Sequence, residues 1–456
     1  MANSPLPMER YSELIRYIEE NRDRYVGWAS RLIEQPSISA HRSGLRECAG
    51  IVAEMLEDLG MRVDVFEVDG SGPVVLGTLN VEAHATLMFY NHYDVQPPDP
   101  LEKWTTPPFT PTIRDGKLYG RGAADNKGNI AARLAALDSV IATLGEAPVN
   151  VKFLIEGGEE VGSPGLEEFV RKEQDRLFAD GCIWEYGYRN RAGRPVINLG
   201  VKGMLYLELE AQGLSREMHS SWGAVVENPA WKLVHALASI RAPDGRVLVD
   251  GFYDDVDYEG EELLEGLSLQ DFNTGERLIA GLEGNPLRTL LLEPTCNING
   301  MIAGYVGPGS KTSLPTEAKA KMDVRLVPRQ DPAKILEKLS EHLRLKGFGD
   351  IALKVLQSYP GARTSHRSFL AKLVAETAHP AYGVEPVVIP SGAASGPMYV
   401  VTDLLGIPCV STGVGYYGSA PHGPNENIRL EDFTAGIKHI ALIMLNFHRY
   451  MHAGDD

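Results

Sequence analysis

The stretch that decides the fold is Met88-Phe-Tyr-Asn-His92-Tyr-Asp94, which closes an apolar run that begins at Ala85. The run predicts a buried strand, and its last residues add an imidazole and a carboxylate. Residues two apart on a strand point to the same side, so His92 and Asp94 are expected to face the same space. Open α/β sheets carry their sites at the carboxyl ends of strands, so the stretch predicts a functional site. The alternative is a strand-end histidine beside a solvated aspartate.

The same pattern occurs twice more along the chain. A second apolar run, 149–155, ends in Glu156-Gly-Gly-Glu159-Glu160, and a third, 181–184, ends in Glu185. A glycine-flanked turn that contains Asp125 leads into a predicted helix over 129–144. Helices alternate with these strands. That order predicts an α/β catalytic domain with a mainly parallel central sheet flanked by helices.

The pattern changes near residue 200. Segments such as 204–211 alternate strictly between apolar and polar residues, which is typical of half-exposed strands in an α+β domain. After about residue 363 the α/β pattern returns. We therefore predict a catalytic domain of residues 1–199 and 363–456, and an inserted α+β domain of residues 200–362.

Composition narrows the class of function. The formal net charge of -17 argues against nucleic acid or an anionic membrane as the main partner. The four cysteines are far apart and form no Cys-x-x-Cys pair, which favours free thiols in a reducing compartment. No apolar run approaches the roughly 20 residues that span a bilayer, and the first ten residues do not read as a signal peptide. We expect a cytoplasmic protein.

The polar groups expected at the strand ends form one constellation, which a histidine before the last helix completes. Its members are His92, Asp94, Asp125, Glu159, Glu160, Glu185 and His422. Imidazoles and carboxylates without a thiolate suit zinc, manganese or cobalt ions. So many carboxylates would repel one another around a single ion. Two divalent ions about 3.5–4 Å apart, bridged by one carboxylate, would relieve the repulsion, and such a site hydrolyses amides.

The motifs that carry this constellation resemble those of metallopeptidase family M20, and they occur in the family's order. They are His92-x-Asp94, Gly120-Arg-Gly-x-x-Asp125-x-Lys-Gly, Glu156-Gly-x-Glu159-Glu160-x-Gly-Ser and the late His422. The family includes carnosinases and other dipeptidases, aminoacylases, deacylases and glutamate carboxypeptidases. The inserted region, with Asp323-Val-Arg325-Leu-Val-Pro328, resembles the carnosinase-like dipeptidases most.

The resemblance implies two divalent metal ions per chain, with zinc expected and manganese or cobalt as alternatives. It implies these ligands: Asp125 as the bridge, His92 and Glu185 at one ion, and Glu160 and His422 at the other. Many carnosinase-like members have Asp where this chain has Glu185, which is a conservative difference. Glu159 would be the general base, and Asp94 would orient the ring of His92. The family pattern also implies a cis peptide bond after Asp125.

The resemblance further implies substrate contacts from the inserted domain, which would act as a lid and dimerisation domain. His219 would stabilise the oxyanion, and in dimeric family members this histidine reaches across from the partner subunit. Arg325 would bind the carboxylate of the substrate, which suits its bidentate geometry. The remaining substrate-binding positions would be Thr312, Ser395 and Asn228. A loop histidine and a strand-paired arginine are the alternatives for His219 and Arg325.

The expected reaction is hydrolysis of a peptide bond next to a free carboxylate, of dipeptidase or carboxypeptidase type. Carnosinases carry an arginine in the run that corresponds to Pro390-Ser-Gly-Ala-Ala-Ser395-Gly-Pro397, and this chain lacks it. An amidohydrolase for N-acyl or N-carbamoyl amino acids therefore stays open. A metal-free binding or scaffold protein is a third reading, and the filled ligand positions argue against it. A homodimer is expected from the resemblance alone.

Overall fold

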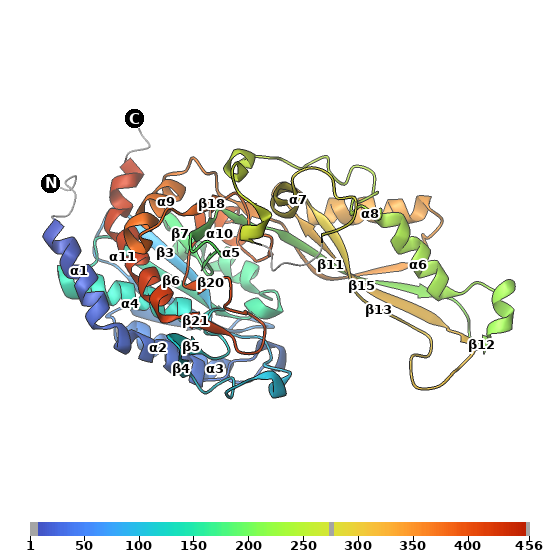
Figure 1. Cartoon of the computed structure of the whole chain (residues 1–456), viewed down its shortest axis with the longest axis horizontal. Coiled ribbons are helices and arrows are strands. Elements are labelled where there is room, and N and C mark those ends of the chain that lie inside the picture. The colour runs from blue at the N-terminus through green and yellow to red at the C-terminus, as the bar shows by residue number, and fades with distance from the viewer. Residues whose placement is uncertain (1–7, 273–277, 453–456) are drawn as a thin grey trace. The chain divides into compact units, whose positions relative to one another are not determined.

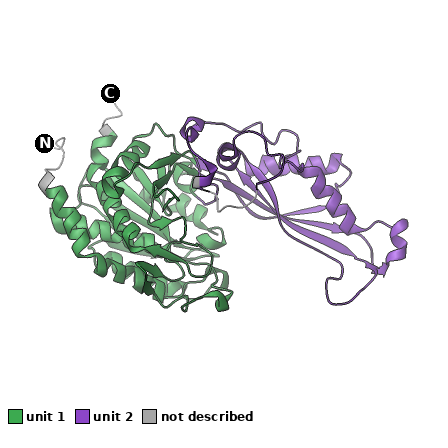
Figure 2. Cartoon of the chain, in the orientation of Figure 1, with its two compact units in different colours: residues 1–200, 363–390, 398–456 green, residues 201–362, 391–397 purple. Residues whose placement is uncertain are grey.

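The computed structural model describes residues 8–272 and 278–452, so the outermost residues of the predicted catalytic domain lie outside the described part. The chain divides into two compact units (Figure 2). Unit 1 comprises residues 1–200, 363–390 and 398–456, and unit 2 comprises residues 201–362 and 391–397.

The segment 391–397 belongs to unit 2, whereas the sequence pattern predicts it in the catalytic domain. Two hydrogen bonds explain this. The backbone N–H of Lys202 donates to the carbonyl of Ala394 at 2.9 Å, and the hydroxyl of Ser395 donates to the carbonyl of Gly203 at 2.8 Å. An irregular segment must pair its backbone groups somewhere, and here the start of unit 2 provides the partners.

Unit 1 is built around a mixed sheet (Figure 1). In spatial order its strands are β1 (Arg62–Phe66), β2 (Gly72–Leu79), β6 (Asn150–Gly157), β3 (Thr86–His92), β7 (Gly181–Trp184), β19 (Cys409–Ser411), β9 (Pro195–Asn198), β8 (Tyr188–Arg189) and β20 (Gly415–Tyr416), with β18 (Val387–Ile389) paired to β9. β3 runs parallel to β6 and β7, and β19 runs parallel to β7. β1 and β2 add an antiparallel edge. The predicted fold class, α/β with a mainly parallel centre, is confirmed.

Helices cover this sheet. They are α1 (Met8–Glu20), α2 (Arg22–Glu34), α3 (Leu45–Glu57), α4 (Lys127–Leu144), α5 (Leu166–Leu177), α9 (Phe369–Tyr382), α10 (Tyr399–Thr402) and α11 (Leu430–His452). α4 lies against β3 and is contacted by α1, α2 and α11 (Figure 1). Because α4 is enclosed by these neighbours, it is apolar on nearly every side and almost wholly buried.

A small antiparallel sheet brings two distant loops together. It consists of β4 (Thr112–Arg114), β5 (Lys117–Tyr119) and β21 (Asn427–Arg429). Asn427 lies opposite Tyr119, so the turn that leads to Asp125 adjoins the loop that holds His422. Short 3-10 turns occur at η1 (Ser39–His41), η2 (Leu101–Lys103) and η3 (Glu159–Val161). In the described ranges no helix is long and apolar enough to cross a membrane.

Unit 2 is an antiparallel sheet with helices packed on it. In spatial order the strands are β13 (Thr295–Ala303), β15 (Glu317–Leu326), β11 (Gly203–Gln212) and β16 (Ala352–Tyr359). The helices α6 (Pro229–Ile240) and α8 (Pro332–Leu345) lie against it. On β11 the leucines at 205, 207 and 209 are buried while the alternate side chains are partly exposed, as the alternation predicts. Each buried leucine contributes roughly 1.5–3 kcal/mol.

The remaining elements of unit 2, with the two that join it to unit 1 along the chain, are short. They are β10 (Gly200–Val201), which pairs with β17 (Ala362–Arg363), β12 (Met218–His219), which pairs with β14 (Ser313–Leu314), η4 (Ser220–Ala224), η5 (Glu261–Leu264), η6 (Leu269–Asp271) and α7 (Pro286–Leu292). β12 and β14 lie beyond the end of the sheet at which β15 begins (Figure 1).

Candidate metal centre

The end of β3 holds the first two site residues. His92 is buried, and its Nδ1 lies 3.1 Å from the carbonyl oxygen and 3.4 Å from the carboxylate Oδ1 of Asp94. The two oxygens of that carboxylate accept the backbone N–H groups of Glu159 and Glu160 at 3.2 and 3.1 Å. Asp94 therefore ties the histidine at the end of β3 to the turn η3 that follows β6. With Nδ1 occupied in this way, the Nε2 of His92 faces the site.

A buried glutamate fixes the position of Asp125. The carboxylate of Glu426 accepts the N–H groups of Gly122, Ala124 and Asp125 at 3.0, 2.9 and 3.0 Å. It also pairs with the guanidinium of Arg121 at 2.7 Å. The peptide bond between Asp125 and the next residue is cis, as the family resemblance implies. The hydrogen bonds to Glu426 fix the backbone from which the Asp125 side chain extends.

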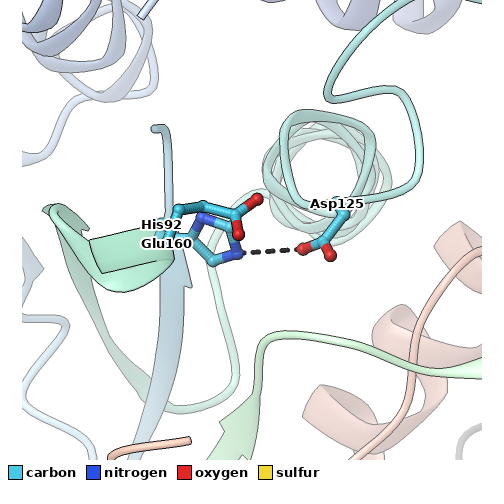
Figure 3. Close-up of side chains that lie close together, drawn as sticks. All are labelled: His92, Asp125 and Glu160. Carbon is cyan, nitrogen blue, oxygen red and sulfur yellow. Dashed lines mark hydrogen bonds and ion pairs between the residues drawn. The ribbon is translucent and has the colours of Figure 1, made fainter. Parts of the chain in front are cut away.

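The carboxylate of Asp125 faces an imidazole with each of its oxygens. Its Oδ1 lies 3.0 Å from Nε2 of His92, and its Oδ2 lies 3.2 Å from Nε2 of His422. Each imidazole has a second carboxylate beside it: Glu185 Oε2 is 3.5 Å from His92, and Glu160 Oε2 is 3.1 Å from His422. The site thus has two halves that meet at Asp125. Figure 3 shows His92, Asp125 and Glu160 turned toward one another.

The ionisation of these groups shows how crowded the charges are. Burial raises the pKa of Glu185 to about 8, although the charge of His92 opposes the shift. Burial and then the charge of Glu185 raise the pKa of Glu159 well above its usual range. Hydrogen bonds to Asp125 and Glu160 raise the pKa of His422 to about 10. The imidazoles and carboxylates hold one another charged, while further carboxylates in the same space are forced toward the neutral form.

The donor set fits divalent metal ions. Ligand atoms of His92, Asp125 and Glu160 lie within 4.8 Å of one another. The buried Oε2 of Glu185 has no hydrogen-bond partner among the described residues, which is costly for a buried carboxylate unless a cation satisfies it. His92 is enclosed, whereas the side chain of His422 is 55 % exposed, so the cluster is open on the His422 side.

The candidate substrate residues of unit 2 fall into two groups. His219 and Thr312 are exposed neighbours: Ser220 donates its N–H to the Thr312 carbonyl at 2.9 Å, and His219 lies opposite Ser313 in the β12–β14 pair. Arg325 is near the other end of β15, and Ser395 binds Gly203, which lies opposite Leu326 in the sheet.

The side chains of Arg325 and Asn228 each have a partner inside unit 2. The Nε of Arg325 donates to Oδ2 of Asp323 at 2.9 Å, which leaves its terminal nitrogens without a partner among the described residues. The side-chain oxygen of Asn228 accepts the N–H of Ala230 at 2.9 Å, so Asn228 caps α6. Among the described residues, no hydrogen bond or ion pair joins Asn228 to Arg325 or Ser395.

The two groups lie far apart within unit 2. β15 extends from Glu317, near His219 and Thr312, to Arg325, and eight residues of strand span about 26 Å. An extended dipeptide spans only about 7 Å. One chain therefore cannot place both groups on the same dipeptide.

The sequence interpretation assigned no role to the residues that hold the ligands in place. These are Asn91, Gln96, Arg121, Asn126, Arg133 and Glu426. Arg121 lies inside a motif quoted for the site, so its position was a usable signal, and Glu426 follows His422 by four residues. Arg133 lies among alanines and leucines in an apolar helix, which is also a signal because a buried charge requires partners.

A mainly parallel sheet with imidazoles and carboxylates converging at its strand ends defines a metal-dependent hydrolase. The chain belongs to the peptidase family M20/M25/M40, whose model matches residues 88–446. It is accordingly a hydrolase that acts on peptide bonds and uses divalent metal.

Relatives match almost the whole chain. The Beta-Ala-His dipeptidase of Homo sapiens is 30% identical over 482 residues, which cover 98% of this chain and 94% of that protein. The Cys-Gly metallodipeptidase of Schizosaccharomyces pombe is 27% identical over 466 residues, covering 93% and 96%. The crystal structure of the M20 family metallo-carboxypeptidase Sso-CP2 from Sulfolobus solfataricus is 40% identical, with a TM-score of 0.87, and covers 92% of this chain and 98% of that chain.

Proposed function

We propose that the protein is a two-metal dipeptidase that cleaves the peptide bond next to a free carboxylate. The observation that carries this proposal is the position of Asp125, whose two oxygens face two separate imidazole–carboxylate pairs. Relatives named as dipeptidases cover almost the full length of the chain, which supports the same substrate class.

The ligands divide between two positions. His92 and Glu185 would hold one ion, Glu160 and His422 the other, and Asp125 would bridge them. Zinc, manganese or cobalt would suit these ligands. Such ions, when bound, lower the pKa of water and stabilise the negative charge that develops on the substrate oxygen.

Glu159 is proposed as the general base. Its backbone is fixed by Asp94 at 3.2 Å, and its carboxylate has no hydrogen-bond or ion-pair partner among the described residues. Positive charge at the site would lower its pKa toward neutrality, where a base works best. Glu159 would take the proton of the attacking water and deliver it to the leaving amine.

Arg325 is proposed to bind the substrate carboxylate with its terminal nitrogens. Asp323 holds the Nε of Arg325 and is itself held by the amide of Asn299 at 2.8 Å, so the guanidinium is oriented before the substrate arrives. Ser395, Thr312 and Asn228 are the further proposed substrate positions. Asn228 already caps α6, so its contribution would be indirect.

A second copy of the chain is proposed as the partner. β13 pairs with β15 on one side only, and it exposes Ile298, Met301 and Ile302. The neighbouring α6, which also packs on β15, exposes Trp231 and Val234. A two-fold interface would pair the β13 edges and bury both apolar faces.

This dimer would also explain how His219 and Thr312 can act although they are separated from Arg325 along β15. His219 and Thr312 cannot reach a dipeptide that Arg325 of the same chain binds. In a dimer, His219 and Thr312 of each copy would instead serve the site of the other copy. His219 would there stabilise the oxyanion. A reducing, cytoplasmic location is proposed as well, because all four cysteines are free and buried.

The second candidate is an amidohydrolase for N-acyl or N-carbamoyl amino acids. The segment 390–397 lacks the arginine that carnosinases carry there, which favours this second candidate. Ser395 in that segment uses its hydroxyl to bind the carbonyl of Gly203.

A substrate panel separates the two candidates. It contains dipeptides, the same dipeptides amidated at the C-terminus, and N-acetyl and N-carbamoyl amino acids. We expect turnover of the free dipeptides and a large loss on amidation, because amidation removes the charge that Arg325 would bind. Turnover of only the acyl or carbamoyl compounds would replace the dipeptidase by the amidohydrolase.

A further inference from the structure

Arg133 on α4 is a buried cation for which the proposed reaction gives no role. Its residue is 1% exposed, and it forms no ion pair within the described ranges. Burial lowers the pKa of its guanidinium to about 10, so the group stays charged at neutral pH. Burying a charge without a counter-charge is costly, and only well-placed acceptors offset that cost.

The acceptors of Arg133 are oxygen atoms at the ends of three neighbouring strands. One terminal nitrogen binds the carbonyl of Tyr90 and, at 2.6 Å, the Oδ1 of Asn91. The other binds the carbonyl of Trp184 and lies 3.5 Å from that of Thr412. Tyr90 and Asn91 immediately precede His92 on β3, Trp184 immediately precedes Glu185 on β7, and Thr412 follows β19.

A chain of side-chain amides continues from this guanidinium. The Nδ2 of Asn91 donates to Oδ1 of Asn126, and the Nδ2 of Asn126 donates to the carbonyl of Glu185 at 2.8 Å. Asn126 directly follows Asp125. The network therefore runs from Arg133 through Asn91 and Asn126 to the backbone of Glu185.

The direct contacts of Arg133 lie beside His92 and Glu185, in one half of the site, and Arg133 reaches the residue after Asp125 only through Asn91. The other half is held by different groups: Gln96 donates to Oε2 of Glu160 at 2.8 Å, and Arg121 donates to the carbonyl of His422 at 3.1 Å. We propose that Arg133 is a positioning residue, an inference that rests on the proposed two-metal function. Arg133 sets metal affinity at the His92–Glu185 half and not at the Glu160–His422 half.

The guanidinium suits this task because its planar fork reaches acceptors on several strands at once. A lysine keeps the charge and reaches fewer of them. Partners that orient metal ligands change metal affinity by about 10- to 100-fold when they are removed. Arg133→Lys should therefore weaken one metal-binding step by about that factor and leave the other unchanged.

Equilibrium dialysis of the metal-stripped full chain against Mn²⁺ or Zn²⁺ alone tests the proposal. Arg133→Lys is compared with wild type, with the exposed control Arg171→Lys, and with Glu185→Gln and Glu160→Gln, each of which removes a ligand from one half. Circular dichroism confirms that each variant is folded. Should Arg133→Lys not fold, Asn91→Ala interrupts the same network and takes its place.

We expect the binding curve of Arg133→Lys to change in the same step as that of Glu185→Gln, while Arg171→Lys matches wild type. Two unchanged steps, or two steps weakened equally, would overturn the role of Arg133. A wild-type chain that binds no metal would instead overturn the proposed function, so the two failures are distinguishable.

Discussion

A buried glutamate and a half-buried one near the site differ in their surroundings. Burial raises the pKa of Glu156 to about 7, and its carboxyl is bound by the hydroxyls of Tyr90 and Ser163. The pKa of Glu159 is also raised, first by burial, but its carboxylate has no such partners among the described residues. Glu156 is therefore fixed by its partners, whereas the carboxyl group of Glu159 is left free for the proposed role of general base.

At the residue scale, Glu159→Gln should lower kcat by roughly 10²–10⁴-fold, because it removes a general base without changing the shape of the side chain. Metal content should match wild type, since Glu159 is not among the proposed ligands. Steady-state kinetics with elemental analysis measures both quantities. The exposed Glu168→Gln on α5 is the matched control. Near wild-type turnover in Glu159→Gln would assign the base elsewhere.

His439 makes stability depend on pH. This buried ring contacts the Val374 carbonyl at 2.9 Å and the Thr412 hydroxyl at 3.1 Å, and burial lowers its pKa from 6.5 to about 4. Below pH 6.5 the unfolded chain binds a proton that the folded chain does not. His439 should therefore remove up to about 3 kcal/mol of stability as pH falls from 6.5 to 4.

The measurement is the melting temperature of wild type and His439→Gln between pH 7.5 and 5. The variant loses the hydrogen bonds of the ring, so it should melt lower at pH 7.5, and the gap should narrow as pH falls. A gap that stays constant over this range would show that the folded and unfolded states protonate His439 alike.

At the scale of elements, periodicity predicted most of what positions the site. The apolar runs that end in His92, Glu159 and Glu185 are β3, β6 and β7, because a strand buried on both faces needs an apolar sequence of this length. Apolar residues recur at helical spacing throughout 8–34, which predicts one helix, but the stretch forms α1 and α2, which meet at Asn21. Both helices continue the same apolar face, so periodicity did not reveal the break.

The contacts that support the ligands could not be predicted in the same way. Arg133 binds β3, β7 and the residue after β19, and these acceptors are up to 279 residues away in sequence. The place of Ser395 in unit 2 depends on hydrogen bonds of the segment 391–397 to Lys202 and Gly203. Such long-range pairings leave no periodic signal, because each is specified by the fold and not by the local sequence.

The exposed edge strand β13 gives a prediction for the proposed dimer. Ile302→Asp should produce monomers, because a charge on an apolar pairing edge opposes association. The matched control is Val355→Asp on β16, the strand at the other edge of the same sheet, which should stay dimeric. Sedimentation velocity distinguishes the two. Dimers that persist in Ile302→Asp would move the interface elsewhere.

The separation along β15 predicts complementation between inactive variants. His219→Ala and Glu159→Ala should each be inactive, and their mixture should regain about a quarter of wild-type activity after subunit exchange. Half of the dimers would then be mixed, with one intact site of two. Glu159→Ala mixed with His422→Ala is the control and should regain none, because both changes lie in the same unit. No recovery after proven exchange would place His219 in its own chain's site.

At the scale of the whole molecule, the family and the fold class could be predicted from a few motifs in order. The distance within unit 2 between the candidate residues near Glu317 and Arg325 could not be predicted, because it depends on the length of β15. The net charge of -17 is spread over a chain whose site gathers many carboxylates. Divalent cations bound only by the folded state would therefore stabilise it, and their removal should lower the melting temperature.

The measurement that tests the central claim most directly is a metal titration of the stripped protein followed by dipeptide turnover. We expect activity to return as about two divalent ions bind per chain, and Glu159→Gln to bind the same number without turnover. Full activity in the stripped protein, or a protein that takes up no metal, would contradict the account.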